Sequence, residues 1–254
     1  MSEVLVRAPT SRFDALDALR GGAMVWMTVF HFCFDLNHFG YLRQNFYQDP
    51  FWTWQRAAIV SLFLLCAGMG QAVAVAQQQS WPRFWRRWVQ IAGCAVLVSA
   101  GSYWMYPNSY IYFGVLHGMA LMLLIARLSA SWGRWLWPLG ALALAAPWVA
   151  LQALDTLRLA ELFNQKGLNW LGLITRRPVT EDYVPVLPWL GVMWWGMALG
   201  TALLQARPAV LTKTLGRVGR GLAWLGRWSL SYYMLHQPVM LGILMVVGAV
   251  VKRQ

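Results

Sequence analysis

Charged residues are scarce in this sequence of 254 residues. Asp, Glu, Lys and Arg together account for 12% of the chain, against about a quarter in an ordinary soluble domain. Hydrophobic residues account for 59%, a proportion that a water-soluble core does not explain. Seventeen Trp and nine Tyr add the aromatic excess that is typical of rings at the headgroup level of a bilayer. The composition predicts one compact membrane domain over residues 1–254.

Cysteine is rare too, and the usual motifs of soluble enzymes are missing. Cys33, Cys66 and Cys94 lie inside apolar segments, so we interpret each as a small buried hydrophobic residue rather than half of a disulfide. The sequence offers no Cys and His residues at metal-ligand spacing, no Gly-rich phosphate loop and no serine nucleophile elbow. We therefore expect no metal cofactor.

Acidic residues number only 9 against 21 Lys and Arg, which gives a net charge of +12. In a soluble protein this excess would indicate a nucleic-acid partner. Here the basic residues stand in short segments between apolar stretches and never form one dense patch. We therefore expect membrane lipids as partners and no nucleic acid, while the sequence leaves a homo-oligomer open.

Long apolar stretches make up most of the sequence. A bilayer core about 30 Å thick needs about 20 apolar residues of helix, so the sequence predicts an all-α fold, a polytopic transmembrane helical bundle of about seven spans. The expected spans are 18–37, 54–76, 88–106, 111–128, 135–153, 188–206 and 228–250. Basic residues sort the loops so that the N-terminus is cytoplasmic and the polar stretch 154–187 is an external loop with a short helix. Lys252 and Arg253 then fall on the far side, so eight spans are the alternative.

Ionisable side chains in the first span depart most clearly from a purely apolar chain, and such groups inside a membrane usually mark function. Asp17 and Arg20 are three residues apart and His31 and Asp35 are four apart, so each pair shares a helix face and can touch. Arg20 and His31 lie roughly 16 Å apart along the same face of a helix. The span thus presents a cation toward the inner side and an imidazole toward the outer side, as a site that crosses the membrane requires.

His31 and Asp35 suggest general-base chemistry. Asp35 can accept a hydrogen bond from one ring nitrogen of His31, which leaves the other nitrogen as a base for a hydroxyl or amine. The alternative is a satisfied buried histidine beside a helix-end carboxylate, with no chemistry attached. His117, His236 and Gln237 are polar residues of later spans. Each either belongs to the same site or only satisfies hydrogen bonds within and between helices.

Four segments of the chain, taken in order, carry a family resemblance. They are Asp17-Ala-Leu-Arg20-Gly21 followed by His31-x-x-x-Asp35-Leu36, then Tyr112-Phe-Gly-Val-Leu-His117-Gly118, then Asp182-Tyr183-Val-Pro-Val-Leu-Pro188-Trp189-Leu-Gly191, and last Leu225-Gly-Arg227-Trp-Ser229-Leu-Ser-Tyr-Tyr-Met-Leu-His236-Gln237-Pro238. In this order and spacing the chain resembles, over nearly its whole length, the heparan-alpha-glucosaminide N-acetyltransferase-like family of bacterial membrane proteins.

The resemblance implies a membrane acyltransferase of the bacterial inner membrane. In the wider transmembrane acyltransferase group an Arg, ten residues and a His stand in the first helix, and Arg20 and His31 have that spacing. Acyl-coenzyme A, expected to be acetyl-coenzyme A, would approach from the cytoplasm. Its acyl group would pass to an amino or hydroxyl group of a saccharide or cell-envelope acceptor on the far side. Arg20 would lie near the donor, and His31 with Asp35 would act at the acyl group.

The same resemblance suggests the other site residues. Guanidinium groups suit bidentate contact with the phosphates of the coenzyme, although topology alone also demands arginines on the inner side. The candidates are Arg83, Arg86, Arg87, Arg217, Arg220 and Arg227. His38 is a rival base, because lysosomal members of the family place their catalytic His further along this segment. The residues expected to support the catalytic pair or contact substrate are Asp17, His38, His117, Tyr183, Ser229, His236 and Gln237.

A transporter is the competing interpretation. Proton-coupled transport also uses intramembrane His and Asp, so a permease-like protein in which the same groups line a pathway accounts for them without any bond being made. A third interpretation is a non-catalytic membrane scaffold. That interpretation leaves Arg20, His31, Asp35 and His117 as unfavourable intramembrane groups without a purpose.

Overall fold

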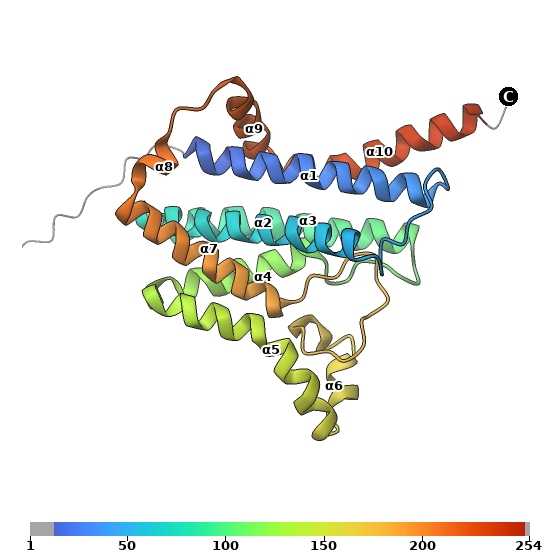
Figure 1. Cartoon of the computed structure of the whole chain (residues 1–254), viewed down its shortest axis with the longest axis horizontal. Coiled ribbons are helices and arrows are strands. Elements are labelled where there is room, and N and C mark those ends of the chain that lie inside the picture. The colour runs from blue at the N-terminus through green and yellow to red at the C-terminus, as the bar shows by residue number, and fades with distance from the viewer. Residues whose placement is uncertain (1–12, 252–254) are drawn as a thin grey trace, which may run out of the picture. The chain divides into compact units, whose positions relative to one another are not determined.

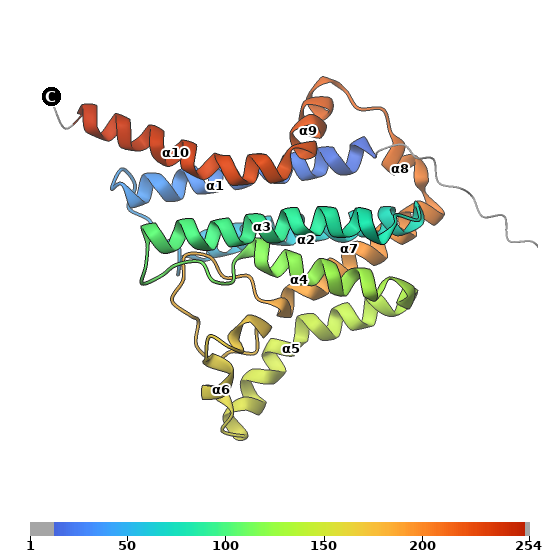
Figure 2. The same ribbon diagram turned by 180° about the vertical axis from the view of Figure 1, so that it is seen from behind.

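The computed structural model describes residues 13–251 of the chain, except the side chains of Asp155 and Val251. Over this range it contains helices and no strand, which confirms the all-α class (Figures 1 and 2). The α-helices are α1 (Asp14–His38), α2 (Pro50–Ala76), α3 (Trp81–Met105), α4 (Val115–Leu128), α5 (Leu136–Thr156), α6 (Ala160–Asn164), α7 (Val186–Ala206), α8 (Pro208–Thr212), α9 (Arg217–Arg227) and α10 (Ser229–Val251). Two short 3₁₀ helices are η1 (Ala130–Trp135) and η2 (Asn169–Leu171).

Each predicted span coincides with a helix, but these helices differ in length and polarity. Within the described range, five helical stretches are long and apolar enough to cross a membrane, namely α2, α3, Ala130–Leu154 with most of α5, α7 and α10. Helix α4 has 14 residues, about 21 Å of helix, which is shorter than a bilayer core of about 30 Å. Helix α1, with two Asp in its first turn, is not among the five. The chain is thus a multi-pass membrane protein, and the count of seven spans stays a prediction.

Large apolar side chains lie on the outside of several helices. Trp104 on α3 is 90% exposed, Trp148 on α5 is 80% exposed and Leu235 on α10 is 62% exposed. Soluble monomers rarely expose contiguous apolar surface on a large scale. Lipid tails solvate such surface without penalty, so these faces suit contact with a bilayer.

The helices form two compact units, and the boundary between the units falls inside α2 after Phe63. The first unit is Leu64–Leu211, in which α7 is the most buried span. Gly196 and Gly200 of α7 have the four-residue spacing that lets membrane helices approach closely. A Cβ atom on Gly196 would lie 2.8 Å from Leu65 Cα, and one on Gly200 would lie 2.9 Å from Met69 Cα. Helices α7 and α2 therefore pack almost backbone to backbone.

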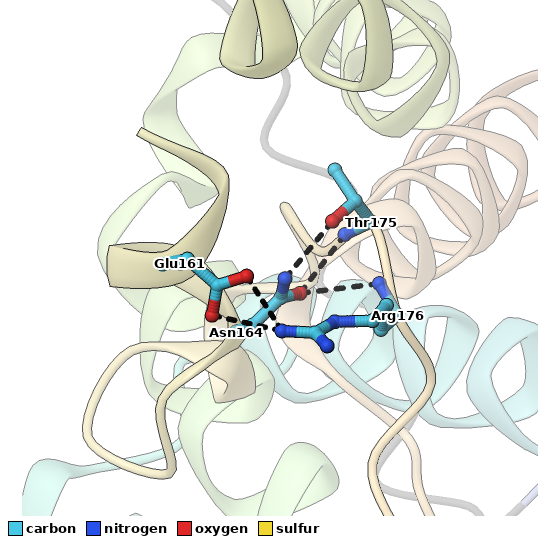
Figure 3. Close-up of polar contacts among 4 residues, drawn as sticks. All are labelled: Glu161, Asn164, Thr175 and Arg176. Carbon is cyan, nitrogen blue, oxygen red and sulfur yellow. Dashed lines mark hydrogen bonds and ion pairs between the residues drawn. The ribbon is translucent and has the colours of Figure 1, made fainter. Parts of the chain in front are cut away.

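The polar loop between α5 and α7 is held together by one asparagine. Asn164 Nδ2 donates to Thr175 Oγ1 over 2.9 Å, and its Oδ1 accepts from the backbone N–H groups of Thr175 and Arg176, each over 3.1 Å (Figure 3). Arg176 Nη2 also donates to both carboxylate oxygens of Glu161 over 2.6 and 2.8 Å. Both charged side chains are largely exposed, and exposed ion pairs add little stability. Asn164 therefore contributes more to the order of the loop than the ion pair does.

The second unit contains α1, the first part of α2, α9 and α10. Asp14 and Asp17 stand in the first turn of α1, where negative charge interacts favourably with the helix dipole. Helix α9 packs on α1 where glycines allow close approach, because a Cβ atom on Gly21 would collide with the backbone of Leu222 and one on Gly226 with that of Asp17. Helix α10 lies beside α1 in both views (Figures 1 and 2). Helices α9 and α10 thus both pack on α1.

Candidate functional site

Polar side chains recur every three or four residues along the second half of α1. Thr28, His31 and Asp35 follow one another at this spacing, which keeps side chains on one face of an α-helix. All three make side-chain hydrogen bonds to α10. Asp35 is 2% exposed. The polar face of α1 is therefore turned toward α10.

His31 of α1 meets His236 of α10. Nδ1 of His31 lies 2.8 Å from Nε2 of His236. The ring planes differ by 13° and the centroids are 5.1 Å apart, so the imidazoles meet edge to edge in nearly one plane, as a hydrogen bond between ring nitrogens requires. His236 is 6% exposed, whereas His31 is partly exposed. The partner of His31 is thus His236 and not the expected Asp35.

Thr28 and Tyr232 form a second contact between the two helices. Thr28 Oγ1 donates to the carbonyl oxygen of Met24 over 2.8 Å, so Tyr232 Oη is the donor in its 2.7 Å bond with Thr28 Oγ1. The Tyr232 ring lies parallel to His236, with 8° between the planes and 5.9 Å between the centroids. Neither residue was predicted to belong to the site. Their positions, three residues before His31 and four before His236, are the signal that could have found them.

Asp35 and Gln237 form the third contact. Gln237 Nε2 donates to Asp35 Oδ1 over 2.7 Å, which explains why Asp35 is not the partner of His31. The remaining oxygens of the pair, Asp35 Oδ2 and Gln237 Oε1, are buried and have no hydrogen-bond partner within the described part of the chain. Buried acceptors in proteins are nearly always paired. Two unpaired acceptors on one bonded pair of side chains indicate where donor groups of a ligand can bind.

Charged residues gather at the first turns of α1. Arg20 Nη1 lies 2.9 Å from Asp17 Oδ1, so the predicted contact between these residues is confirmed. Arg227 at the end of α9 reaches Asp14 Oδ1 over 2.6 Å and Asp17 Oδ2 over 3.8 Å. Arg217, at the first residue of α9, is exposed. A role for Arg20 and Arg227 at coenzyme phosphates therefore has to compete with carboxylates, while Arg217 lies open to solvent or lipid headgroups.

His117 lies in the first unit, at the start of α4. Ser99 Oγ donates to the carbonyl oxygen of Ile111 over 2.6 Å, so it accepts from His117 Nε2 over 3.0 Å. The backbone N–H of Gly114 donates to His117 Nδ1 over 3.3 Å. Both ring nitrogens thus serve local hydrogen bonds at the end of a helix, and a role for His117 in chemistry stays a prediction.

Tyr183 also belongs to the first unit. Its Oη donates to the carbonyl oxygen of Asn169 over 2.6 Å, and Asn169 Nδ2 donates to Tyr112 Oη over 2.7 Å. Burial raises the pKa of the Tyr183 phenol, so this group remains a neutral donor. Arg83 and Arg87 are exposed near the start of α3. Their predicted contact with the coenzyme, like the predicted role of Tyr183, stays a prediction.

The structure therefore divides the predicted residues of the second unit into two groups. One lies at the contact between α1 and α10 and consists of His31, Asp35, His236 and Gln237. The other lies at the contact between α1 and α9 and consists of Asp17, Arg20 and Arg227. Ser229, the first residue of α10, is buried, and His38, the last residue of α1, is exposed. Neither of these two joins the histidine pair.

Apolar helices with apolar outer faces define a polytopic membrane protein, in which paired polar side chains join α1 to α10. Among the described residues, no three His, Cys, Asp or Glu side chains are grouped so that they could hold a metal ion. A family model described as heparan-alpha-glucosaminide N-acetyltransferase, catalytic, matches residues 12–238. The chain belongs to this family of membrane acetyltransferases, which confirms the resemblance seen in the sequence. No curated protein and no solved structure matches the chain.

Proposed function

We propose that the chain transfers an acetyl group from cytoplasmic acetyl-coenzyme A to an amino or hydroxyl group of a saccharide or cell-envelope acceptor on the far side of the bacterial inner membrane. The proposal depends on one observation. His31, a residue of intermediate exposure, is held through its imidazole by His236, and one turn further along α1 the Asp35–Gln237 pair leaves two buried oxygens without a donor among the described residues. Membership of an acetyltransferase family supplies the class of reaction.

The reaction requires a base close to the acceptor. The nitrogen or oxygen of the acceptor attacks the carbonyl carbon of the thioester and gives up a proton, the C–S bond breaks, and the thiolate of coenzyme A takes up a proton. His31 accepts the proton of the attacking group. Asp35 Oδ2 and Gln237 Oε1 accept hydrogen bonds from N–H or O–H groups of the acceptor substrate. These bonds orient the substrate for attack on the thioester.

The donor binds through its phosphates to arginines at the cytoplasmic side. Arg20, Arg217 and Arg227 in the second unit and Arg83 and Arg87 in the first are the candidates. The excess of basic residues, 21 against 9 acidic ones, and the bidentate geometry of guanidinium with phosphate support this assignment. Coenzyme binding would draw Arg20 and Arg227 away from Asp17, with which both now pair.

This route requires α1 to cross the membrane with the N-terminus in the cytoplasm, and we infer seven spans in total, with eight as the alternative. Pairing supports a transmembrane α1, because ionisable groups inside a bilayer are tolerated when they face protein and find partners. Asp17 pairs with two arginines, and Asp35 bonds to Gln237. Cysteine labelling at Arg253 tests the count, since accessibility from outside supports seven spans and protection supports eight.

The experiment that tests the function uses purified protein in lipid nanodiscs, labelled acetyl-coenzyme A and an envelope extract. Wild type should transfer label to the extract, and His31→Ala should lose at least about 100-fold in rate, because a general base contributes about 10²–10⁴-fold. Val29→Ala is the matched control, since Val29 lies on the same helix and is 57% exposed. Failure of wild type to bind coenzyme A, or full activity of His31→Ala, would overturn the proposal. Uptake of a substrate without transfer would instead indicate a transporter.

A further inference from the structure

The backbone of α10 determines where His236 carries its proton. Nδ1 of His236 lies 2.7 Å from the carbonyl oxygen of Tyr233. A carbonyl oxygen only accepts hydrogen bonds, so Nδ1 must be the donor. A neutral imidazole has one donor and one acceptor nitrogen. Nε2 of His236 is therefore an acceptor.

The proton of His31 follows from that of His236. Nδ1 of His31 lies 2.8 Å from the acceptor nitrogen of His236, so it must carry the proton of this hydrogen bond. Nε2 of His31 is then left with a lone pair. No hydrogen bond within the described part of the chain engages this nitrogen, and His31 is the partly exposed member of the pair.

A second proton on His236 would reverse these roles, and the surroundings disfavour it. His236 is 6% exposed, and an unpaired charge is unfavourable in such a place. The titratable groups that face the pair are Asp35 from α1 and Tyr232 and Tyr233 from α10. Asp35 is bonded to Gln237, and no carboxylate in the described part of the chain hydrogen-bonds either ring. Neutral His236 is thus the form that fits.

We propose that His236 is a positioning residue that holds His31 in the tautomer with a proton on Nδ1, so that Nε2 of His31 is the nitrogen that takes the proton of the acceptor. The role of this tautomer in catalysis rests on the proposed acetyl transfer, whereas the tautomer itself follows from the geometry alone. The chain of bonds runs from the Tyr233 carbonyl through His236 to His31. When Nε2 gains a proton, the ring becomes a cation and its bond to His236 becomes charge-assisted, which stabilises the charged form. Parallel packing of Tyr232 on His236 holds the ring plane.

Nuclear magnetic resonance of protein with ¹⁵N-labelled histidine rings reads the tautomer without any assay of activity. The chain has only 4 His, so single substitutions assign each signal. Wild type should show a protonated Nδ1 and an unprotonated Nε2 for both His31 and His236, and His236→Leu should abolish the preference at His31. A protonated Nε2 on His31 in wild type would overturn the proposal. If wild type transfers no acetyl group, the proposed function fails while this measurement still decides the tautomer.

Two variants of similar size separate positioning from packing. Asn carries its amide near the place of Nδ1, so His236→Asn keeps a donor for the Tyr233 carbonyl but offers His31 no acceptor. Gln carries its amide near the place of Nε2, so His236→Gln restores that acceptor. His236→Asn should lower kcat by about 10–100-fold with an unchanged KM for acetyl-coenzyme A, as losses of orienting partners commonly do, and His236→Gln should recover most of it. Thermal unfolding curves establish that both variants are folded. Equal kcat values for the two folded variants would contradict a positioning role.

Discussion

Adjacent glycines on α1 provide a sharp test of the contact between α1 and α9. A Cβ atom on Gly21 would lie 2.7 Å from the carbonyl carbon of Leu222 and closer still to its oxygen, whereas a Cβ atom on Gly22 would meet nothing within 4 Å. Overpacking by one methyl group destabilises a well-packed contact by about 1–3 kcal/mol. Alanine in an open helical position is favoured over glycine by about 0.5–1 kcal/mol. The same substitution at neighbouring positions should therefore change stability in opposite directions.

The assay is unfolding of Gly21→Ala and Gly22→Ala in detergent micelles, monitored by intrinsic tryptophan fluorescence with increasing denaturant. We expect Gly21→Ala to unfold at lower denaturant than wild type and Gly22→Ala at equal or higher denaturant. The two free energies of unfolding should differ by about 1–3 kcal/mol, because the gain from replacing glycine by alanine in a helix is common to both positions and only the overpacking at Gly21 separates them. Gly226→Ala should behave like Gly21→Ala, because its Cβ atom would lie 2.8 Å from the carbonyl carbon of Asp17. If Gly21→Ala and Gly22→Ala unfold together, α9 does not pack on α1 in this way.

Three further predictions concern polar contacts. Asp35→Asn should raise the KM for the acceptor substrate roughly 10-fold and leave the KM for acetyl-coenzyme A unchanged, because a neutral amide accepts hydrogen bonds more weakly than a carboxylate. Steady-state kinetics with each substrate varied in turn measure both values, and equal effects on the two KM values would contradict the prediction. Tyr232→Phe should lower the free energy of unfolding by about 0.5–1.5 kcal/mol through loss of one hydrogen bond. The double variant with Thr28→Val should lose little further stability, whereas fully additive losses would show that the two hydroxyls are not partners. Asn164→Ala should speed tryptic cleavage of the loop before α7 several-fold. Glu161→Gln breaks only an exposed ion pair and should leave the cleavage rate nearly unchanged. Faster cleavage of Glu161→Gln than of Asn164→Ala, followed on a gel, would refute the reasoning.

Local spacing predicted one half of the candidate site. The positions of His31 and Asp35, four residues apart on an apolar helix, correctly indicated one polar face. The identity of their partners could not be read from that spacing, because a side chain on a helix face can bond either along its own helix or across to another. In the structure both bond across, to His236 and Gln237 of α10. Only the packing of α1 against α10 decides between these choices, and it depends on the whole chain.

Hydropathy predicted where the long helices lie better than where they begin and end. The third span was expected to begin at residue 88, but α3 begins at Trp81 with Pro82 in its first turn, because arginines and a first-turn proline are compatible with helix although they are not apolar. The fourth was expected from residue 111, but α4 begins at Val115 after an extended Gly114, where His117 satisfies the backbone N–H of that glycine. Helix ends follow capping and backbone conformation, which an apolarity scale does not detect.

The two imidazoles of the pair are separated by 205 residues in the sequence. A ribosome that adds about 5–20 residues per second makes His31 roughly 10–40 seconds before His236. Throughout that interval α1 has Asp17, His31 and Asp35 but neither of the helices that bond to them. Helix α1 therefore has to wait, at the translocon or at the membrane surface, for α10. Biogenesis of this protein should depend on insertion machinery that retains a polar helix until α10 has been made.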